Sequence, residues 1–278
     1  MSFDNNNYNQ NTADNQWNGS TWSDDSYDDG YQSFDNSSFE AYDATANSGV
    51  NAIHNIAKVG FEENVFTQSF VFMAIALAIT AFAAWYTSNS PSMLFFLFGG
   101  GSGFTIMLVA EIAIVIAANF AISRNAVVPS AILFTLYSVV NGITLSSVIL
   151  VYTSTSIAAT FFITAGMFGV MALYGVVTKK NLSSIGSICM MALWGIIIAG
   201  IVNMVFLHSS MLELGISILG VIIFVGLIAY DVQKIKSLMR VTTTENITCI
   251  ALLCALEIYL DFINLFLKLL SIFGKRRD

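Results

Sequence analysis

Long intervals of the chain contain no charged side chain, and this feature constrains the fold more than any other. A helix that crosses about 30 Å of hydrocarbon needs about 20 predominantly apolar residues. Only 10% of all residues are charged, against about a quarter in a typical globular protein, and 56% are hydrophobic. The sequence therefore predicts an all-α integral membrane protein. The three charge-free intervals lie between Glu63 and Glu111, between Arg124 and Lys179, and between Lys180 and Glu213.

Seven apolar segments are long enough to cross a bilayer. Together they predict a seven-helix transmembrane domain over residues 65–274. The seventh segment is less apolar than the others. The expected helices are 65–86, 104–123, 128–151, 157–178, 184–207, 212–238 and 247–273.

The N-terminal region differs in composition from the rest of the chain. Residues 1–48 are rich in Asn, Asp and Ser, and hold nine acidic residues and no Lys or Arg. This composition predicts a disordered acidic tail, because too little apolar surface is available to offset the entropy of ordering. Residues 49–64 are expected to form an amphipathic lead-in to the first span, with Lys58 and Glu62 facing water. Residues 275–278 form a basic C-terminus.

The distribution of Lys and Arg indicates the orientation. Alternate loops carry the basic residues, and positively charged loops stay in the cytoplasm. This predicts a cytoplasmic N-terminus. Seven complete spans would then place the basic C-terminus outside, against the rule, so the seventh segment either spans the membrane or re-enters and returns. The basic residues of the alternate loops are Arg124, Lys179, Lys180, Lys234, Lys236 and Arg240.

Acidic residues at membrane depth are the strongest functional signal in the sequence. An acid there is costly, by at least ~2.5 kcal/mol on insertion scales, and marks a functional site by default. Four acids qualify: Glu111, Asp231, Glu257 and Asp261.

The seventh segment carries a polar stripe. Glu257, Asp261, Asn264 and Lys268 are spaced three or four residues apart, so they share one face of a helix. Such a face is stable only against other helices or water, and the seventh helix is therefore expected at the centre of the bundle.

Asp231 and Asp261 lie on consecutive helices and could meet. A turn near 241–245 leaves them about six residues apart in depth, or ~9 Å at 1.5 Å per residue, which tilt or a kink could absorb. Two carboxylates in a low-dielectric site cannot both ionise cheaply, so a pair would share a proton and change its charge with pH. When doubly ionised, the pair would attract Ca²⁺. In the alternative interpretation, a neighbour such as Lys234 or Lys268 neutralises each acid and fixes helix packing.

Three stretches resemble the Bax inhibitor-1 (transmembrane Bax inhibitor motif) family, in the right order and with matching helix spacing. The resemblance covers about residues 65–274. The stretches are Glu257-Ile-Tyr-Leu-Asp261-Phe-Ile-Asn264 with the residues that follow to Gly274, Ala229-Tyr230-Asp231-Val-Gln-Lys-Ile235, and Asn141-Gly-Ile-Thr-Leu-Ser-Ser with the residues that follow to Thr153.

The resemblance implies a seven-helix fold with a central seventh helix, and a pH-sensitive Ca²⁺ leak gated by an aspartate pair. In this chain the pair falls on Asp231 and Asp261. The family also implies groups on the second helix that hold a closed state, for which Glu111 and Arg124 are the candidates. Glu257 departs from the family pattern, where a small polar residue is common, and adds a third carboxylate.

The favoured function is a proton-controlled Ca²⁺ leak in a bacterial plasma membrane, without catalytic turnover and without a cofactor. The expected partners are the lipid bilayer, Ca²⁺ as the permeant ion, protons and other membrane proteins, and no nucleic acid. One alternative is a non-conducting interaction protein that regulates cell survival or membrane-protein turnover. A remote alternative is an intramembrane aspartyl protease, although Asp261 lacks the Gly-x-Gly-Asp context of such enzymes.

Overall fold

A computed structural model describes residues 65–241 and 247–277, with side chains up to residue 238 in the first range. It contains seven helices long and apolar enough to cross a membrane, which confirms the expected all-α fold. No strand occurs in these two ranges, where the only bridge joins two single residues. The expected tail at 1–48 and lead-in at 49–64 lie outside the described residues.

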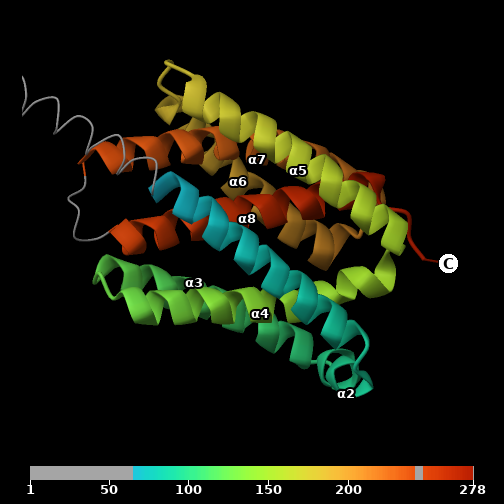
Figure 1. The fold of residues 1–278 in the computed structure, drawn as a ribbon. Coiled ribbons are helices and arrows are strands. Elements are labelled where there is room, and N and C mark those ends of the chain that lie inside the picture. Colours follow the sequence, from blue (N-terminus) through green and yellow to red (C-terminus); the bar gives the residue numbers. More distant parts are fainter. Residues whose placement is uncertain (1–64, 242–246, 278) are drawn as a thin grey trace, which may run out of the picture. The chain divides into compact units, whose positions relative to one another are not determined.

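The seven spans agree with the expected segments to within three residues at each end (Figure 1). The first helix covers Val65–Ser88. The other elements are α2 (Pro91–Leu94), η1 (Phe95–Gly99), α3 (Gly103–Ser123), α4 (Val127–Val151), α5 (Ser154–Val177), α6 (Ser183–Val202), η2 (Asn203–Leu207), α7 (Ser210–Val241) and α8 (Ile247–Phe273).

Two short elements were not anticipated. α2 and the π-helical turn η1 occupy most of the connection between the first helix and α3, ahead of residues 100–102, which form bends. Pro91 stands at the start of α2, where its missing N–H donor has no helical partner to lose.

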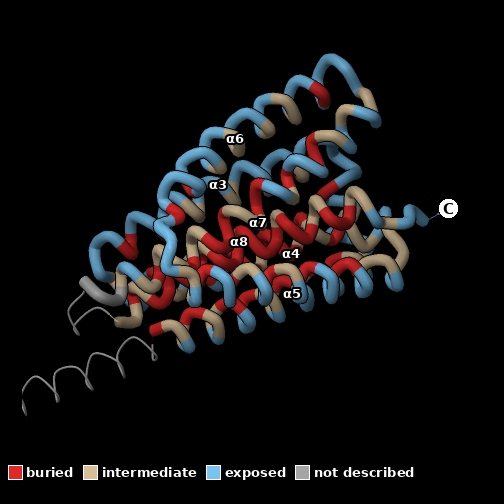
Figure 2. The backbone as a smooth tube through the Cα atoms, turned by 90° about the horizontal axis from the view of Figure 1, so that it is seen from above, coloured by how far each residue is buried: buried red, intermediate tan, exposed pale blue. Residues whose placement is uncertain are grey.

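α8 is the most buried span and packs on α3, α4, α5 and α7. Figure 2 shows this helix largely buried, whereas α3 and α6 are exposed along most of their length. Exposed apolar residues cover the outward faces of the other spans, as expected of surfaces in contact with lipid. The position of α8 agrees with its polar stripe, which needs other helices around it.

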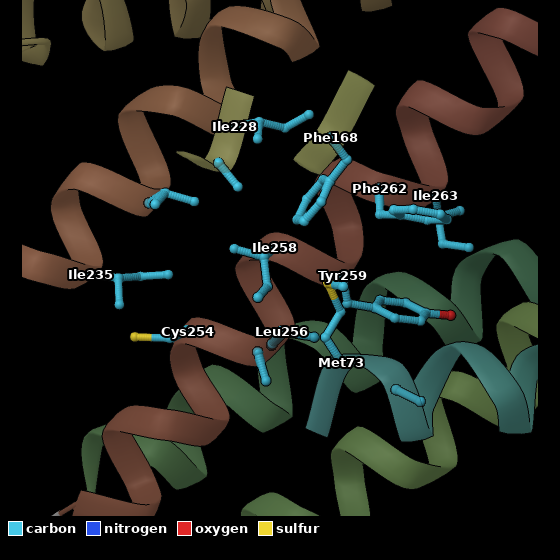
Figure 3. Close-up of a cluster of buried hydrophobic side chains, with 14 of the residues drawn as sticks. Met73, Phe168, Ile228, Ile235, Cys254, Leu256, Ile258, Tyr259, Phe262 and Ile263 are labelled. Atoms are coloured by element: carbon cyan, nitrogen blue, oxygen red, sulfur yellow. The ribbon is translucent and has the colours of Figure 1, made fainter. Parts of the chain in front are cut away.

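The interior of the bundle contains small polar side chains as well as apolar ones. Figure 3 shows part of the apolar cluster around α8. Hydroxyl groups in the spans donate to backbone carbonyls one turn earlier, as Ser69 does to Val65 at 2.8 Å. Tyr259 of α8 is fully buried, and its hydroxyl lies 2.7 Å from that of Thr80 on the first helix. These bonds satisfy polar groups that no water reaches.

The C-terminal residues decide between the two expectations for the seventh segment. α8 is one continuous helix, and after it Arg277 donates a backbone hydrogen bond to Val151 at 2.8 Å. The backbone N–H of Thr153 donates to Lys275 at 3.0 Å. The C-terminus therefore lies at the α4–α5 end of the bundle, here called the C-terminal end. α7 stops and α8 starts at the opposite end, here called the connection end, so α8 crosses the bundle and does not re-enter.

A close helix contact lies next to the acidic residues of α7. Gly175 of α5 faces α7, and a Cβ atom at this position would lie 2.5 Å from the carbonyl oxygen of Ala229. Gly169, two turns earlier on the same helix, is exposed, and a Cβ atom there would meet nothing within 4 Å.

We expect Gly175→Ala to destabilise the protein by about 1–3 kcal/mol, because the added methyl group forces α5 away from α7. Gly169→Ala should leave the stability unchanged or raise it, because alanine favours a helix. Thermal unfolding in detergent measures both variants. Equal midpoints for the two would contradict the close contact.

Candidate functional site

Asp261 is the most deeply buried acid among the described residues. It lies in the middle of α8 and is 6% exposed. Its Oδ2 atom is buried and has no hydrogen-bond partner within the part of the chain that the structure describes. A buried acceptor without a partner is unusual in a folded protein, so this carboxyl group requires an explanation beyond packing.

Asp231 of α7 lies against Asp261. The two carboxyl groups are within hydrogen-bonding reach of each other. Asp231 is ten residues before Val241, and Asp261 is fourteen residues after Ile247. The remaining offset of four residues, or ~6 Å of helix rise, is small enough for helices that cross at an angle. A hydrogen bond between two carboxyl groups requires one proton shared by the pair.

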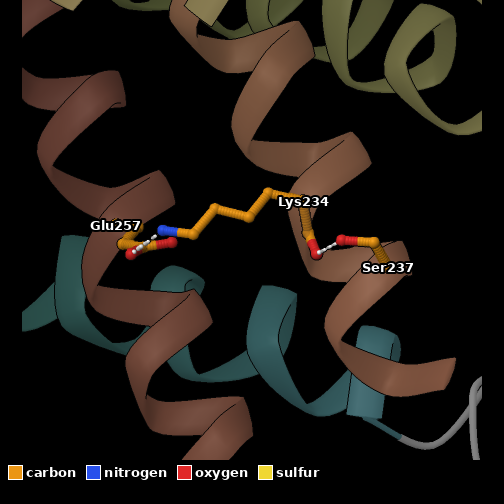
Figure 4. Close-up of polar contacts among 3 residues, drawn as sticks. All are labelled: Lys234, Ser237 and Glu257. Atoms are coloured by element: carbon orange, nitrogen blue, oxygen red, sulfur yellow. Dashed lines mark hydrogen bonds and ion pairs between the residues drawn. The ribbon is translucent and has the colours of Figure 1, made fainter. Parts of the chain in front are cut away.

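Glu257 and Lys234 form a second pair closer to the connection end. The Lys234 ammonium donates to Glu257 at 2.6 Å, and the two side chains are 37% and 23% exposed (Figure 4). This is the only salt bridge among the residues with described side chains. Lys234 therefore bonds to the third carboxylate and not to either aspartate, unlike the alternative in which a lysine neutralises the aspartate pair.

A pocket of about 700 Å³ adjoins Lys234 at the connection end. Gln233 joins one side of this pocket to the α5–α6 connection. Its side chain accepts a hydrogen bond from the Leu182 N–H and donates one to the Lys180 carbonyl, both at 2.8 Å. Tyr230 also lines the pocket, so residues on both sides of Asp231 in the sequence face this space. The remaining lining residues are Val177, Thr178, Lys179, Asn181, Ser183, Lys236 and Ser237.

Glu111 lies apart from the aspartate pair, in a separate polar cluster on α3 and α4. Its carboxyl group is within hydrogen-bonding reach of Thr144, and Oε1 is buried with no partner among the described residues. Asn141 donates to the Tyr137 hydroxyl at 3.1 Å, and its own Oδ1 is likewise buried and unpartnered. The sequence indicated Glu111 but not its neighbours, although Tyr137, Asn141 and Thr144 share one helical face.

The other accessory candidates do not reach the pair. Arg124 is exposed at the end of α3, where its guanidinium lies 4.3 Å from the centre of the Phe120 ring. Asn264 donates to the Leu260 carbonyl of its own helix at 2.8 Å. Lys268 lines cavities between α6, α7 and α8 near the C-terminal end. Of the accessory residues, only Glu257 is placed to influence the charge of the pair.

Within the described ranges, no three or more His, Cys, Asp or Glu side chains are placed to hold a metal ion. Ca²⁺ takes about six to eight oxygen ligands. An ion at the aspartate pair would therefore need water or backbone carbonyls as well.

Comparison with known proteins places these residues in a family. The family model described as "Inhibitor of apoptosis-promoting Bax1" matches residues 62–278. The inner membrane protein YbhL of Escherichia coli K12 is 45% identical over 213 residues, which are 76% of this chain and 91% of the relative. A protein of Borreliella burgdorferi is 44% identical over 211 residues, covering 75% of this chain and 90% of the relative.

The match covers all seven spans, including the three stretches that carried the resemblance in the sequence, and this confirms the resemblance. Since relatives such as YbhL are inner membrane proteins, a multi-pass arrangement in a bacterial membrane agrees with them. The chain is an integral membrane protein that belongs to the Bax inhibitor-1 family.

Proposed function

We propose that the protein is a pH-sensitive Ca²⁺ leak channel, controlled by the protonation state of Asp231 and Asp261. The observation that carries this proposal is that the two carboxyl groups from α7 and α8 meet in the interior of the bundle. No lysine or arginine with a described side chain bonds to either of them. We further propose that Ca²⁺ is the permeant ion and that no catalytic turnover is involved.

The mechanism rests on the charge of the pair. With one shared proton, the pair carries a single negative charge and a hydrogen bond joins α7 to α8. Loss of the proton adds a second negative charge in a poorly solvated site, and the two carboxylates repel each other. This repulsion acts directly between the two helices and also favours entry of a cation. Protonation thus shifts an equilibrium between closed and conducting arrangements of the two helices.

Orientation is part of the same proposal. Arg124, Lys179 and Lys180 occupy connections at the end of the bundle where α7 joins α8. We therefore assign the connection end and the N-terminus to the cytoplasm of a bacterial cell. Membrane-impermeant maleimide should label a cysteine introduced at Asn89 in intact spheroplasts and should not label one introduced at Asn125. The reverse pattern would invert the assignment.

We expect each of Asp231→Asn and Asp261→Asn to abolish the pH dependence of Ca²⁺ flux. One amide beside one carboxylate fixes the charge at the value that the wild-type pair has with one proton. The flux of each variant should therefore stay near the wild-type level at the lower pH. The measurement is flux into dye-loaded liposomes stepped from about pH 6 to about pH 8, a range in which a coupled carboxyl pair can titrate.

The matched control is Glu245→Gln, which makes the same chemical change in the segment joining α7 to α8 and should keep the wild-type response. The proposed gate would be contradicted if wild-type flux did not depend on pH, or if the Asp231→Asn and Asp261→Asn variants kept the wild-type pH dependence. Absence of flux from folded protein under all conditions would favour the non-conducting interaction protein.

Lys234 and Glu257 should shift the pH response in opposite directions. Lys234→Met removes a positive charge that favours ionised carboxylates, so the flux change should move to higher pH. Glu257→Gln removes a negative charge, so the change should move to lower pH. Each shift should be less than about one pH unit, because partly exposed charges interact weakly. The same liposome assay, with the pH varied in small steps, measures both, and shifts of the same sign would exclude this electrostatic coupling.

A further inference from the structure

Lys268 has no hydrogen-bond or ion-pair partner among the residues whose side chains the structure describes. It lies on α8, five residues before Phe273, which is ~7.5 Å of helix rise from the C-terminal end. Within the described part of the chain, nothing accepts a hydrogen bond from its ammonium group and no carboxylate lies within 4.0 Å. Glu213, exposed at the start of α7, interacts with it only at longer range.

The side chain of Lys268 is directed by its contact with α7. Gly220 lies beneath the aliphatic stem: a Cβ atom at Gly220 would lie 3.0 Å from both Cγ and Cδ of Lys268. The stem therefore crosses α7 where that helix has no side chain. Beyond α7, Lys268 lines cavities that residues of α6 also line.

Two cavities adjoin each other at this point, with volumes of about 380 and 530 Å³. Both are lined by Gly200, Met204, Ile216 and Lys268, so they form one groove, here called the Lys268 groove. The smaller cavity lies deeper along α6 and is mostly apolar. Its other lining residues are Leu193, Ile196, Ile197, Ile201, Phe224 and Asn264.

The larger cavity lies toward the C-terminal end and has several polar side chains in its lining. His208, Glu213 and Asn203 line it, with the pair Ser217 and Ser271. The Ser217 hydroxyl donates to Ser271 at 3.0 Å. The Ser271 proton has no acceptor among the described residues, so it is available to a bound group.

The groove opens toward the bilayer. Along its α6 side, Ile201 and Met204 are 55% and 71% exposed on the outward surface of the bundle. An occupant can therefore enter sideways from the lipid phase. It would meet an apolar channel first and a cation with hydroxyl donors at one end.

We propose that the Lys268 groove binds an anionic phospholipid of the surrounding bilayer. The phosphate group lies near Lys268 and Ser271, and an acyl chain follows α6 past Ile197. The choice of ligand follows from charge complementarity. A lysine near a helix end often extends to the membrane interface, but Lys268 adjoins a groove with a polar end and an apolar end. The polar end suits an anionic headgroup, and the apolar end suits an acyl chain. Glu213 faces the same cavity and disfavours a ligand with more than one negative charge.

Native mass spectrometry of the purified full chain tests this site. The protein in mild detergent is mixed with equal amounts of phosphatidylglycerol and phosphatidylcholine that carry the same acyl chains. We expect wild type to retain phosphatidylglycerol preferentially. In Lys268→Met, this preference should fall by about tenfold, the change expected for loss of a charge-assisted hydrogen bond.

Lys275→Met is the matched control, because it removes the same charge from an exposed residue at the same end of the bundle and should keep the preference. Ile197→Trp fills the apolar part and should reduce retention of both lipids. Millimolar inorganic phosphate should not displace the lipid, since it lacks the acyl chain; displacement would mean that the site recognises phosphate alone. Equal retention of both lipids by wild type, or an unchanged preference in folded Lys268→Met, would overturn the proposal.

Discussion

The structure depends on keeping the ionisable side chains of α8 away from hydrocarbon. This helix carries Glu257, Asp261 and Lys268, and a charged group facing lipid is costly. The first helix, α4, α5 and α6 contain no Asp, Glu, Lys or Arg, so they can turn apolar residues toward lipid on any side, whereas α8 cannot. Its position among the first helix, α3, α4, α5 and α7 follows from that difference. The close contact at Gly175 and the buried bond between Tyr259 and Thr80 hold the surrounding helices in place.

The site at the centre of the bundle contains more acids than bases. Asp231, Asp261 and Glu257 lie near a single lysine, and that lysine bonds to Glu257. An ion pair for each acid would give a fixed network suited to packing. The observed imbalance leaves the two aspartates without an ion pair among the described residues, as the proposed gate requires. The pocket beside Lys234 reaches the residues on either side of Asp231 in the sequence, while Asp261 stays buried in the interior.

The spans and the family could be predicted from the sequence because both depend on local patterns. A run of about 20 apolar residues forms a helix in a membrane wherever its neighbours lie, since every backbone group bonds within the segment. The stripe on α8 likewise indicated a central position, because helical spacing alone places Glu257, Asp261 and Asn264 on one face. Local patterns were less informative between the spans, where they did not indicate α2 and η1.

The sequence by itself determined how many helices cross the membrane, where they begin and end, and which acids lie at membrane depth. The tertiary structure decided which of these residues meet. It placed Asp231 against Asp261 and paired Lys234 with Glu257 in a salt bridge. Glu111 and Lys268 lie in separate surroundings. It also set the C-terminus beside the α4–α5 connection. The physical reason is that hydropathy and helical period fix depth and face within one helix, whereas contacts between side chains depend on the tilt and rotation of two helices, which only packing determines.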